Sequence, residues 1–441
     1  MIYTFLKALV KPIHRLFYKR VVIEGRNNIP EGAVIFTPNH QNAMMDALAV
    51  ITSCGRNPYF LARADFFSNP LLRFLFRLLK TIPVYRAKDG VQSLDKNDEV
   101  FEKSSKILTK GKSLVIFPEA GHNNESRLQA LRKGFVRIGF KAEEHLNFEE
   151  DVYVVPVGIF YSDMTRFRST LHIRYGKPVS LKNYKELYNK NPQKSYNVVK
   201  SNVAKRIIPM ILNVKHHENQ QTFNRVVSLY HENLLPQLGL GGKTERNLFL
   251  ARQKVVYLLN QIYERTPEEF NNLRLKVDDY FNELTRLNLT DSQIRGYYKN
   301  NWHPMARWVV LLLTIPVFVY GFIHNVIPYF IPKLAAKNNA DIHYKSSYKF
   351  GLSLVTFPVL YTLEIMLFSF FFSNPWILAA YGIALPLTGF AAFYWFQSVK
   401  QVQTMLRFKK AEKQKSGEYY DLLQMRHDVI KVLDEAVQPY F

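Results

Sequence analysis

The chain has 441 residues, of which 47% are hydrophobic and 14% aromatic, so it can build a folded core and is not a disordered chain. Its formal net charge of +23 implies anionic partners, and nucleic acid, anionic lipid and phosphorylated substrates all meet that requirement. The single cysteine, Cys54, excludes an intrachain disulfide.

The N-terminal segment mixes apolar residues with several lysines and arginines. Its apolar run is too short and too charged to span a membrane, and it lacks the small-residue cleavage site of a signal peptide. We therefore expect residues 1–20 to form an amphipathic helix at a membrane surface, kinked or broken at Pro12.

Residues 21–180 alternate strand-like and helix-like stretches, which predicts an α/β domain. Strands are expected at 21–25, 33–39, 113–119, 152–161 and 171–178, and helices at 71–80, at 98–111 and from Asp46 onward.

Residues 181–300 are polar and mostly helical in pattern. The stretch Thr266-Pro267-Glu268-Glu269 is typical of a helix start, with Thr as the cap and Pro at the first position. Apolar residues from Leu273 to Leu284 then recur on one face. We expect this helix to form a hairpin with residues 246–263.

Two long stretches near the C-terminus are almost free of charge. Residues 308–332 contain no Lys, Arg, Asp or Glu, and residues 350–399 contain only Glu364. A membrane span needs about 20 apolar residues, so the second stretch predicts a transmembrane hairpin, followed by a basic tail at 400–441. The prolines and polar residues of 308–332 favour a re-entrant or interfacial path over a straight span. Basic flanks on all three sides favour the cytoplasm for both ends of the hairpin.

One candidate catalytic segment runs from Asn39-His40 to Asp46, between an expected strand and an expected helix. A histidine near a carboxylate can act as a general base, because the carboxylate fixes the tautomer and stabilises the imidazolium. Such a pair arises by chance often enough that, alone, it does not distinguish a base from a histidine that caps a loop.

Further motifs follow this pair along the chain. They are Ala62-Arg63-Ala64-Asp65 leading into Ile82-Pro83-Val84-Tyr85-Arg86, then Phe117-Pro118-Glu119-Ala120-Gly121-His122, Leu131-Arg132-Lys133-Gly134 and Val155-Pro156-Val157-Gly158. In this order, the motifs resemble those of the glycerolipid acyltransferase superfamily, which includes glycerol-3-phosphate and 1-acylglycerol-3-phosphate acyltransferases. The resemblance covers about residues 20–180.

The resemblance implies that His40 takes the proton from a glycerol hydroxyl and that Asp46 orients and supports His40. An alcohol is a poor nucleophile unless a base removes its proton during attack, so such a base is chemically required. A thioester donor needs no covalent enzyme intermediate.

The resemblance also implies residues that bind the substrate. Arg86 would bind the phosphate, Glu119 and Gly121 would shape the phosphate site, Lys133 matches a basic residue after that motif, and Pro156 would shape the site and the acyl groove. An arginine fork matches a phosphate dianion. Taken singly, Arg86 also fits a solvated surface charge, Glu119 a loop cap and Pro156 a strand-edge residue.

Three departures from the family pattern concern the substrate more than the reaction. Five residues separate His40 from Asp46 instead of four, Ala120 precedes Gly121 in the third motif, and Lys80-Thr81 replaces an expected glycine. The first two departures resemble the subgroup typified by fungal glycerol-3-phosphate/dihydroxyacetone-phosphate acyltransferases.

We therefore expect an α/β acyltransferase domain with a mixed sheet, then a helical region and C-terminal membrane helices. The donor would be acyl-CoA or acyl-carrier protein, and the acceptor glycerol 3-phosphate, dihydroxyacetone phosphate or 1-acylglycerol 3-phosphate. Membrane phospholipid is an expected partner, with the site facing the cytoplasm. No cofactor, metal or nucleic acid is expected, because no ligand cluster or nucleic-acid module is present in the sequence. A non-catalytic lipid-binding membrane protein is the alternative of a different class.

Overall fold

The structure is a computed structural model that describes residues 2–68, 70–85, 92–119, 121, 126–299, 304–338, 341–415 and 417–440. The chain forms two compact units. The first contains Met1–Asn213 with Asn339–Ser347, and the second contains Val214–Asn338 with Tyr348–Phe441.

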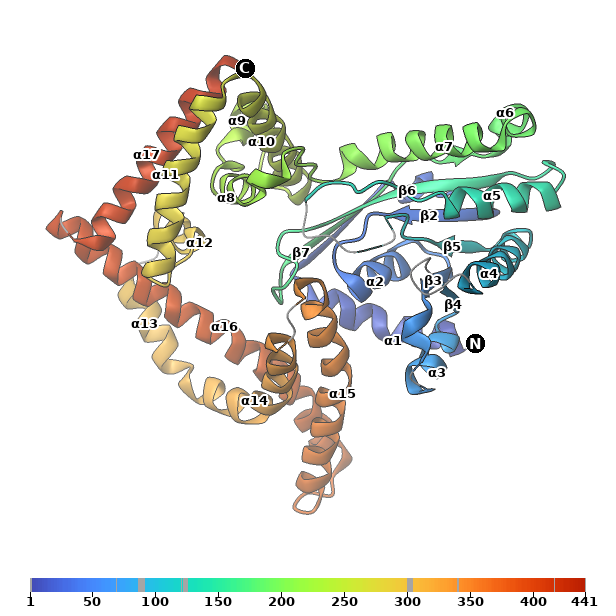
Figure 1. Ribbon diagram of the computed structural model, residues 1–441. Helices are drawn as coiled ribbons and strands as arrows, with labels where there is room; N and C mark the ends of the chain where they lie inside the picture. Colours follow the sequence, from blue (N-terminus) through green and yellow to red (C-terminus); the bar gives the residue numbers. More distant parts are fainter. Residues whose placement is uncertain are drawn as a thin grey trace. The chain divides into compact units, whose positions relative to one another are not determined.

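In its described residues, the first unit is built on a mixed sheet of eight strands. The strands are β1 (Arg20–Glu24), β2 (Ala33–Pro38), β3 (Tyr59–Arg63), β4 (Thr81–Val84), β5 (Ser113–Val115), β6 (Val152–Tyr161), β7 (Thr170–Tyr175) and β8 (Val179–Ser180). Their order is β1-β7-β6-β2-β5-β3-β4, and β8 also pairs with β6 (Figure 1). Strand β6 runs antiparallel to β7 and β8, and the other neighbours run parallel. The five expected strands and the mixed sheet are confirmed, whereas β3, β4 and β8 were not expected.

Helices cover both faces of this sheet. They are α1 (Ile2–Phe17), α2 (Ala43–Ser53), α3 (Pro70–Leu78), α4 (Gln92–Leu108), α5 (Gly134–His145), α6 (Lys185–Lys190) and α7 (Pro192–Ile207). Successive residues of a strand point to opposite faces. Ile35 of β2 packs in the core beneath α5 and α7, whereas Phe36 lies against Tyr175 on the face that α2 covers. This unit extends beyond residue 180, because α7 packs against β6.

Helix α1 has the amphipathic character expected for residues 1–20, and it continues through Pro12 as one helix. One side contributes buried residues to the first unit, whereas large apolar side chains on another side are exposed: Ile2, Phe5, Leu9 and Leu16. Its placement at a membrane surface stays a prediction.

The second unit is helical in the described residues. Its helices are α8 (Gln220–Tyr230), α9 (Leu234–Gln237), α10 (Glu245–Arg265), α11 (Pro267–Arg286), α12 (Asp291–Lys299), α13 (Pro304–Leu313), α14 (Ile315–Lys337), α15 (Ile342–Ser369, from Tyr348 onward), α16 (Pro375–Gln414) and α17 (Glu418–Val437). Helices α10 and α11 meet at Thr266 and pack together, which confirms the expected helical hairpin.

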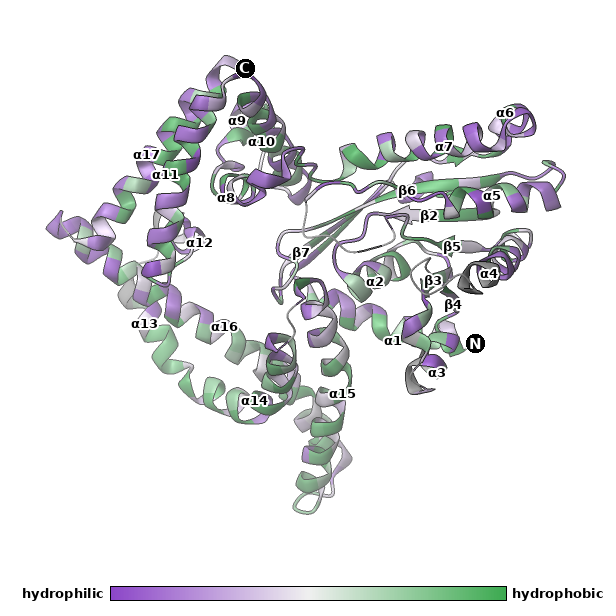
Figure 2. Cartoon of the chain, viewed as in Figure 1, coloured by the Kyte–Doolittle hydropathy of each residue, from purple (hydrophilic) through white to green (hydrophobic). Residues whose placement is uncertain are grey.

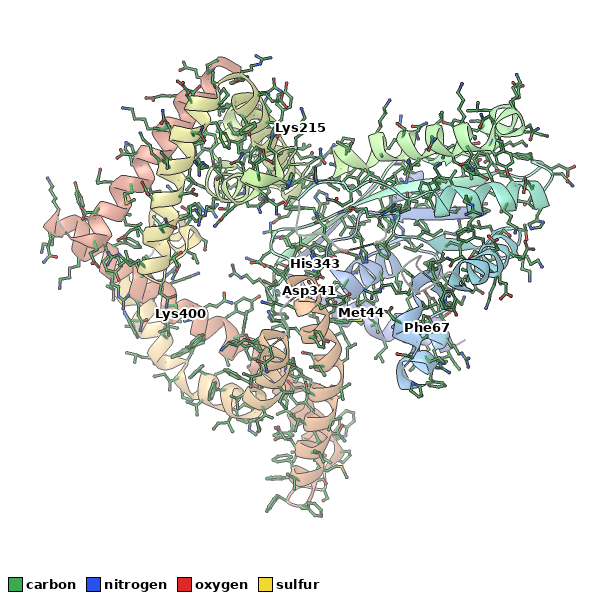
Figure 3. All side chains as sticks on the ribbon, in the orientation of Figure 1. Met44, Phe67, Lys215, Asp341, His343 and Lys400 are labelled. Carbon is green, nitrogen blue, oxygen red and sulfur yellow. The ribbon has the colours of Figure 1, made fainter. Side chains whose placement is uncertain are left out.

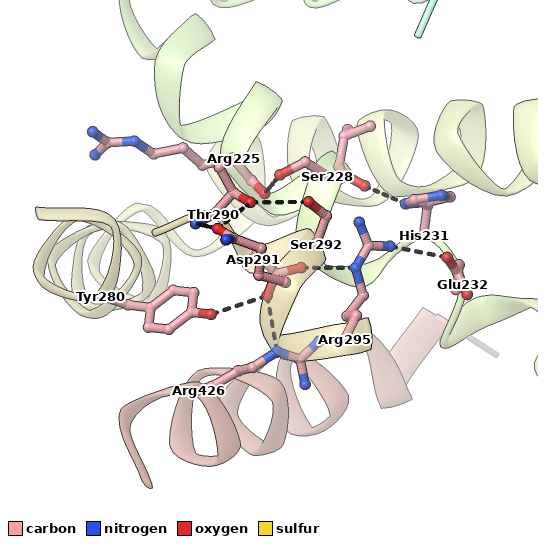
Figure 4. A network of polar contacts seen from close by, with 12 residues as sticks. Arg225, Ser228, His231, Glu232, Tyr280, Thr290, Asp291, Ser292, Arg295 and Arg426 are labelled. Carbon is pink, nitrogen blue, oxygen red and sulfur yellow. Dashed lines mark hydrogen bonds and ion pairs between the residues drawn. The ribbon is translucent and has the colours of Figure 1, made fainter. Parts of the chain in front are cut away.

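A buried carboxylate joins several of these helices (Figure 4). Asp291 of α12 accepts hydrogen bonds from the Tyr280 hydroxyl at 3.0 Å and from Arg426 Nε at 2.8 Å. Arg295 pairs with the other oxygen of Asp291 at 2.8 Å and with Glu232 at 2.9 Å. A buried charge is tolerated only with such partners, so this network fixes α11, α12 and α17 against one another.

Among the residues that the structure describes, three helices are long and apolar enough to cross a membrane: α14, α15 and α16. Figure 2 shows their hydrophobic colouring, and many of their large apolar side chains are exposed. Helices α15 and α16 are separated only by residues 370–374, as expected for a hairpin. Helix α14 is continuous through Pro328 and Pro332, and its re-entrant or spanning path stays a prediction.

Polar side chains in the apolar helices of the second unit have partners. Asn325 of α14 donates to the carbonyls of Gly321 at 2.9 Å and of Leu385 at 3.1 Å. A Cβ atom on Gly321 would lie 2.1 Å from the Thr388 carbonyl oxygen, so only glycine permits this approach of α14 to α16. Small residues and interhelical hydrogen bonds of this kind are the usual means of packing helices in lipid.

Candidate active site

The carboxyl ends of three parallel strands carry the central residues of the site. Strand β2 lies between β5 and β6 and runs parallel to both. Their carboxyl ends therefore meet at one edge of the sheet, where α/β folds usually place ligands. His40 follows β2, Glu119 follows β5, and Tyr161 ends β6.

His40 and Asp46 form the predicted pair. His40 Nδ1 lies 2.9 Å from Asp46 Oδ2, and Asp46, on the first turns of α2, has 0% exposure. A carboxylate only accepts hydrogen bonds, so His40 donates from Nδ1 and Nε2 is the basic nitrogen of the neutral ring. Between the two residues, Ala43 at the start of α2 has a φ of 40°, a left-handed conformation that is uncommon for alanine.

The Asp46 carboxylate accepts four hydrogen bonds. Besides His40, the backbone N–H groups of Gln41 and Asn42 donate to Oδ2 at 2.8 and 2.7 Å. The Tyr161 hydroxyl donates to Oδ1 at 2.7 Å. A carboxylate offers about four acceptor positions, so this buried group is satisfied and its orientation is fixed from several directions.

Tyr161 is a site residue that the sequence analysis missed. Burial, and then the charge of Asp46, raise the pKa of its hydroxyl well above the ordinary value of 10, so the group remains a donor. Its ring packs near Tyr18, with centroids 6.0 Å apart. The available signal was its position at the end of a strand that runs parallel to β2, which is a property of the sheet and not of a local motif.

Glu119 holds the histidine loop from the neighbouring strand. Its Oε1 accepts from the His40 backbone N–H at 2.9 Å, and its Oε2 accepts from the Gln129 backbone N–H at 3.0 Å. Burial raises the pKa of Glu119 to about 7, against the lowering effect of the two N–H donors. The carboxyl group therefore connects the segments after β2 and β5, and its expected contact with a phosphate stays a prediction.

Neighbouring groups also restrict the position of His40. Its ring stacks on Phe117, with centroids 4.0 Å apart and planes inclined by 22°. The preceding residue, Asn39, extends the pairing of β2 with β6 through its side chain, which donates to the Ile159 carbonyl at 3.0 Å and accepts from the Ile159 N–H at 2.7 Å. The backbone before His40 is therefore held in place, and one face of the His40 ring is covered by Phe117.

The other predicted residues occupy varied surroundings. Pro156 is buried on β6 and pairs with Thr37, three residues before His40. Lys133 is the N-cap residue before α5, and its Nζ donates to Gln193 at 3.0 Å on the exposed surface. Gly121 is half-buried, with open space where a Cβ atom would stand.

Arg86 lies outside the described residues. The residue before it, Tyr85, is anchored to α4 by Asn97, whose side chain accepts from the Tyr85 N–H at 3.0 Å and donates to its carbonyl at 2.8 Å. The role of Arg86 stays a prediction. Within the described part of the chain, no group of three or more His, Cys, Asp or Glu residues could hold a metal ion.

The segment that carries this site is similar to known acyltransferases. Residues 20–160 match the family model described as Acyltransferase, and this range contains the His40–Asp46 pair, Glu119 and Pro156. The match confirms the resemblance to the glycerolipid acyltransferase superfamily that the motifs indicated.

Two similar curated proteins are plant enzymes. The chloroplastic 1-acyl-sn-glycerol-3-phosphate acyltransferase of Arabidopsis thaliana is 25% identical over 127 residues, which are 28% of this chain and 33% of that enzyme. The corresponding Brassica napus enzyme is 24% identical, over 28% of this chain and 35% of its own length. The chain thus spans about a third of the length of these relatives. A crystal structure of the 1-acyl-sn-glycerophosphate acyltransferase PlsC from Thermotoga maritima aligns with 46% of this chain and 80% of its own, at 20% identity and a TM-score of 0.33.

Proposed function

We propose that this chain, which carries an acyltransferase domain in residues 20–160, moves a fatty acyl group from a thioester to a hydroxyl of a glycerol phosphate. The observation that carries the proposal is the hydrogen bond between His40 Nδ1 and the buried Asp46 carboxylate. It leaves Nε2 as the nitrogen able to take a proton from an alcohol.

In the proposed reaction, His40 Nε2 removes the hydroxyl proton while the hydroxyl oxygen attacks the thioester carbonyl carbon. The new ester C–O bond forms, the C–S bond breaks, and the sulfur leaves as a thiolate that takes the proton back from His40. Asp46 stabilises the imidazolium in between, and its four donors prevent it from turning away.

For the acceptor we propose glycerol 3-phosphate or dihydroxyacetone phosphate, with acyl-CoA or acyl-carrier protein as the donor. Arg86 would bind the phosphate, with Glu119, Gly121, Lys133 and Pro156 shaping the surrounding site. The net charge of +23 supports an anionic acceptor.

A second acceptor, 1-acylglycerol 3-phosphate, is favoured by the names of the two plant relatives. In either case the product is a membrane lipid, and the three apolar helices would keep the enzyme beside it. We place the site on the cytoplasmic face, because basic residues flank the apolar stretches.

The test is a transfer assay with purified full-length protein in lipid nanodiscs. Radiolabelled palmitoyl-CoA and palmitoyl-carrier protein would each be offered with glycerol 3-phosphate, dihydroxyacetone phosphate or 1-acylglycerol 3-phosphate. We expect transfer to glycerol 3-phosphate, and His40→Ala should lower it by at least about a hundredfold, because the general base is lost.

The matched control is His427→Ala, which removes an exposed histidine of α17 and should retain wild-type transfer. Transfer only to 1-acylglycerol 3-phosphate would establish the second acceptor. Absence of transfer to all three acceptors, or a His40→Ala variant with more than half of the activity, would contradict the proposal.

A further inference from the structure

The first turn of α15 packs into the first unit, although it lies about 300 residues after residues 39–42. These residues join β2 to α2 and carry His40, and we call them the catalytic loop. Asn339–Ser347 belongs to that unit, and α15 then continues to Ser369 as a candidate membrane span. His343 is 4% exposed and Ser346 is 0% exposed. Residues three apart share a face of a helix, so both side chains point into the unit.

Both side chains contact backbone carbonyls beside the active site. His343 Nδ1 hydrogen-bonds the Gln41 carbonyl, and Ser346 Oγ donates to the Met164 carbonyl. The Asn42 side chain donates to the same Met164 carbonyl at 3.1 Å. Figure 3 labels His343 and Asp341 near Met44, on the first turn of α2. The turn thus contacts both the loop after β2 and the loop after β6.

The Gln41–Asn42 peptide group is held from both sides. Its C=O accepts from His343, and its N–H, which belongs to Asn42, donates to Asp46 Oδ2 at 2.7 Å. In a trans peptide the C=O and N–H point in opposite directions. His343 and Asp46 therefore fix one rigid plane between them, and a rotation of that plane would break both contacts.

The start of α15 is itself anchored. The His343 backbone N–H donates to Asp341 Oδ1 at 2.9 Å, as in a helix N-cap. This contact sets the first turn, so that His343 and Ser346 are presented together. A carbonyl oxygen only accepts, so the His343 ring must carry its proton on Nδ1 to make the contact with Gln41.

We propose that His343 is a positioning residue that holds the Gln41–Asn42 peptide, and through it the Asp46–His40 pair, in the catalytic geometry. Ser346 supports the same loop by bonding the Met164 carbonyl, which also accepts from the Asn42 side chain. The catalytic loop is then complete only when the first turn of α15 is docked. This inference rests on the proposed function, because it concerns the same site.

The experiment uses full-length protein in nanodiscs with four variants. His343→Ala removes the donor to Gln41, and His343→Asn restores one, because the asparagine amide can donate from a similar position. Ser346→Ala removes the contact with Met164. The matched control is Ser347→Ala, since the neighbouring Ser347 hydroxyl is buried without a hydrogen-bond partner in the described part of the chain.

Kinetics separate positioning from simple packing. We expect His343→Ala to lower kcat about tenfold with KM for donor and acceptor changed less than about twofold, as for loss of a contact that orients the base. Ser346→Ala should lower kcat several-fold, whereas His343→Asn should recover most of the activity and Ser347→Ala should match the wild type. A His343→Ala enzyme with wild-type kcat, or an Asn variant no better than Ala, would overturn the inference.

Hydrogen–deuterium exchange of peptides covering residues 41–46 provides a readout that does not need activity. Exchange at the Asn42 amide should be faster in His343→Ala than in Ser347→Ala, because its hydrogen bond to Asp46 opens more often. If the wild type transfers no acyl group but exchange responds as expected, the proposed function fails and the positioning role stands. Unchanged exchange in His343→Ala would refute the positioning role itself.

Discussion

Tyr161 and Asp46 are joined by a 2.7 Å hydrogen bond that connects the end of β6 to the start of α2. Both residues are buried, and the bond occupies the carboxylate oxygen opposite the one that bonds His40. Asp46 is thus held by the sheet on one side and by its own loop on the other. The pair that performs the proposed chemistry therefore depends on the register of β6 beside β2.

Tyr161→Phe should lower kcat by about tenfold or more and leave both KM values nearly unchanged. It removes one charge-assisted hydrogen bond, worth roughly 1.5–3 kcal/mol, from the group that supports the imidazolium. Tyr175→Phe is the matched control. It also removes a buried tyrosine hydroxyl, but one that forms its 2.6 Å hydrogen bond with Ser53 and not with Asp46. Equal kcat in the two variants, measured by steady-state transfer, would show that the Tyr161 hydroxyl has no such role.

Glu119→Gln should change how thermal stability depends on pH. The pKa of Glu119 is raised from 4.5 to about 7, so the folded protein holds this proton more tightly than the unfolded chain. Between these two values unfolding releases a proton, and the free energy of unfolding falls as the pH rises. The melting temperature of the wild type relative to Glu119→Gln should therefore fall from pH 5 to pH 8.

Scanning fluorimetry at several pH values measures this difference, with the exposed Glu150→Gln as a control that should parallel the wild type. Activity should also fall in Glu119→Gln. A glutamine has one acceptor oxygen, so it cannot accept both the His40 and Gln129 N–H groups. If the melting temperatures of the wild type and Glu119→Gln differ by the same amount from pH 5 to pH 8, the raised pKa of Glu119 is contradicted.

Arg86→Ala should raise KM for the glycerol phosphate by about ten- to a hundredfold and leave donor KM nearly unchanged. The lost contact is a charge-assisted hydrogen bond to phosphate, worth roughly 1.5–3 kcal/mol. Arg246→Ala, which removes an exposed arginine of α10, controls for the loss of one positive charge. If KM rises for the acyl donor and stays unchanged for the glycerol phosphate, Arg86 binds the donor instead.

The predicted hairpin can be tested by cysteine labelling in a Cys54→Ser background. Single cysteines would replace Asn338 after α14, Ser373 between α15 and α16, and Gln414 at the end of α16, all exposed positions. An impermeant maleimide added to intact cells should label only the cysteine at position 373, because only the hairpin turn reaches the far side. The hairpin keeps positions 338 and 414 on the same side of the membrane as the active site. Labelling of either position from outside the cell would therefore contradict it.

Local patterns predicted the elements of the first unit better than their arrangement. The apolar run at 152–161 is strand β6 over its full length, because a central strand is apolar on both faces. Strands β3 and β4 are only five and four residues long, which explains why their pattern was not recognised. The neighbours of each strand could not be read, since parallel pairing joins segments that are far apart in sequence.

The same distinction applies to the site. His40 and Asp46 lie six residues apart, so one loop can bring them together and a motif can reveal them. Glu119, Tyr161 and His343 reach that loop from β5, β6 and α15 through contacts that span 79 to 302 residues of sequence. Their roles follow from the order of the strands and from the docking of a distant helix, and neither leaves a local pattern.

Helix α16 is 40 residues long, so at 1.5 Å per residue it extends about 60 Å, twice the roughly 30 Å of a bilayer's hydrocarbon core. Its second half carries Lys400, Arg407 and Lys409, while Val402, Met405 and Phe408 of the same half are buried. The helix also packs against α12 and α17. One unbroken helix thus joins the apolar segments of the second unit to its polar helices. Because the helix is continuous, a tilt of its apolar half would also displace the helices that pack on its charged half.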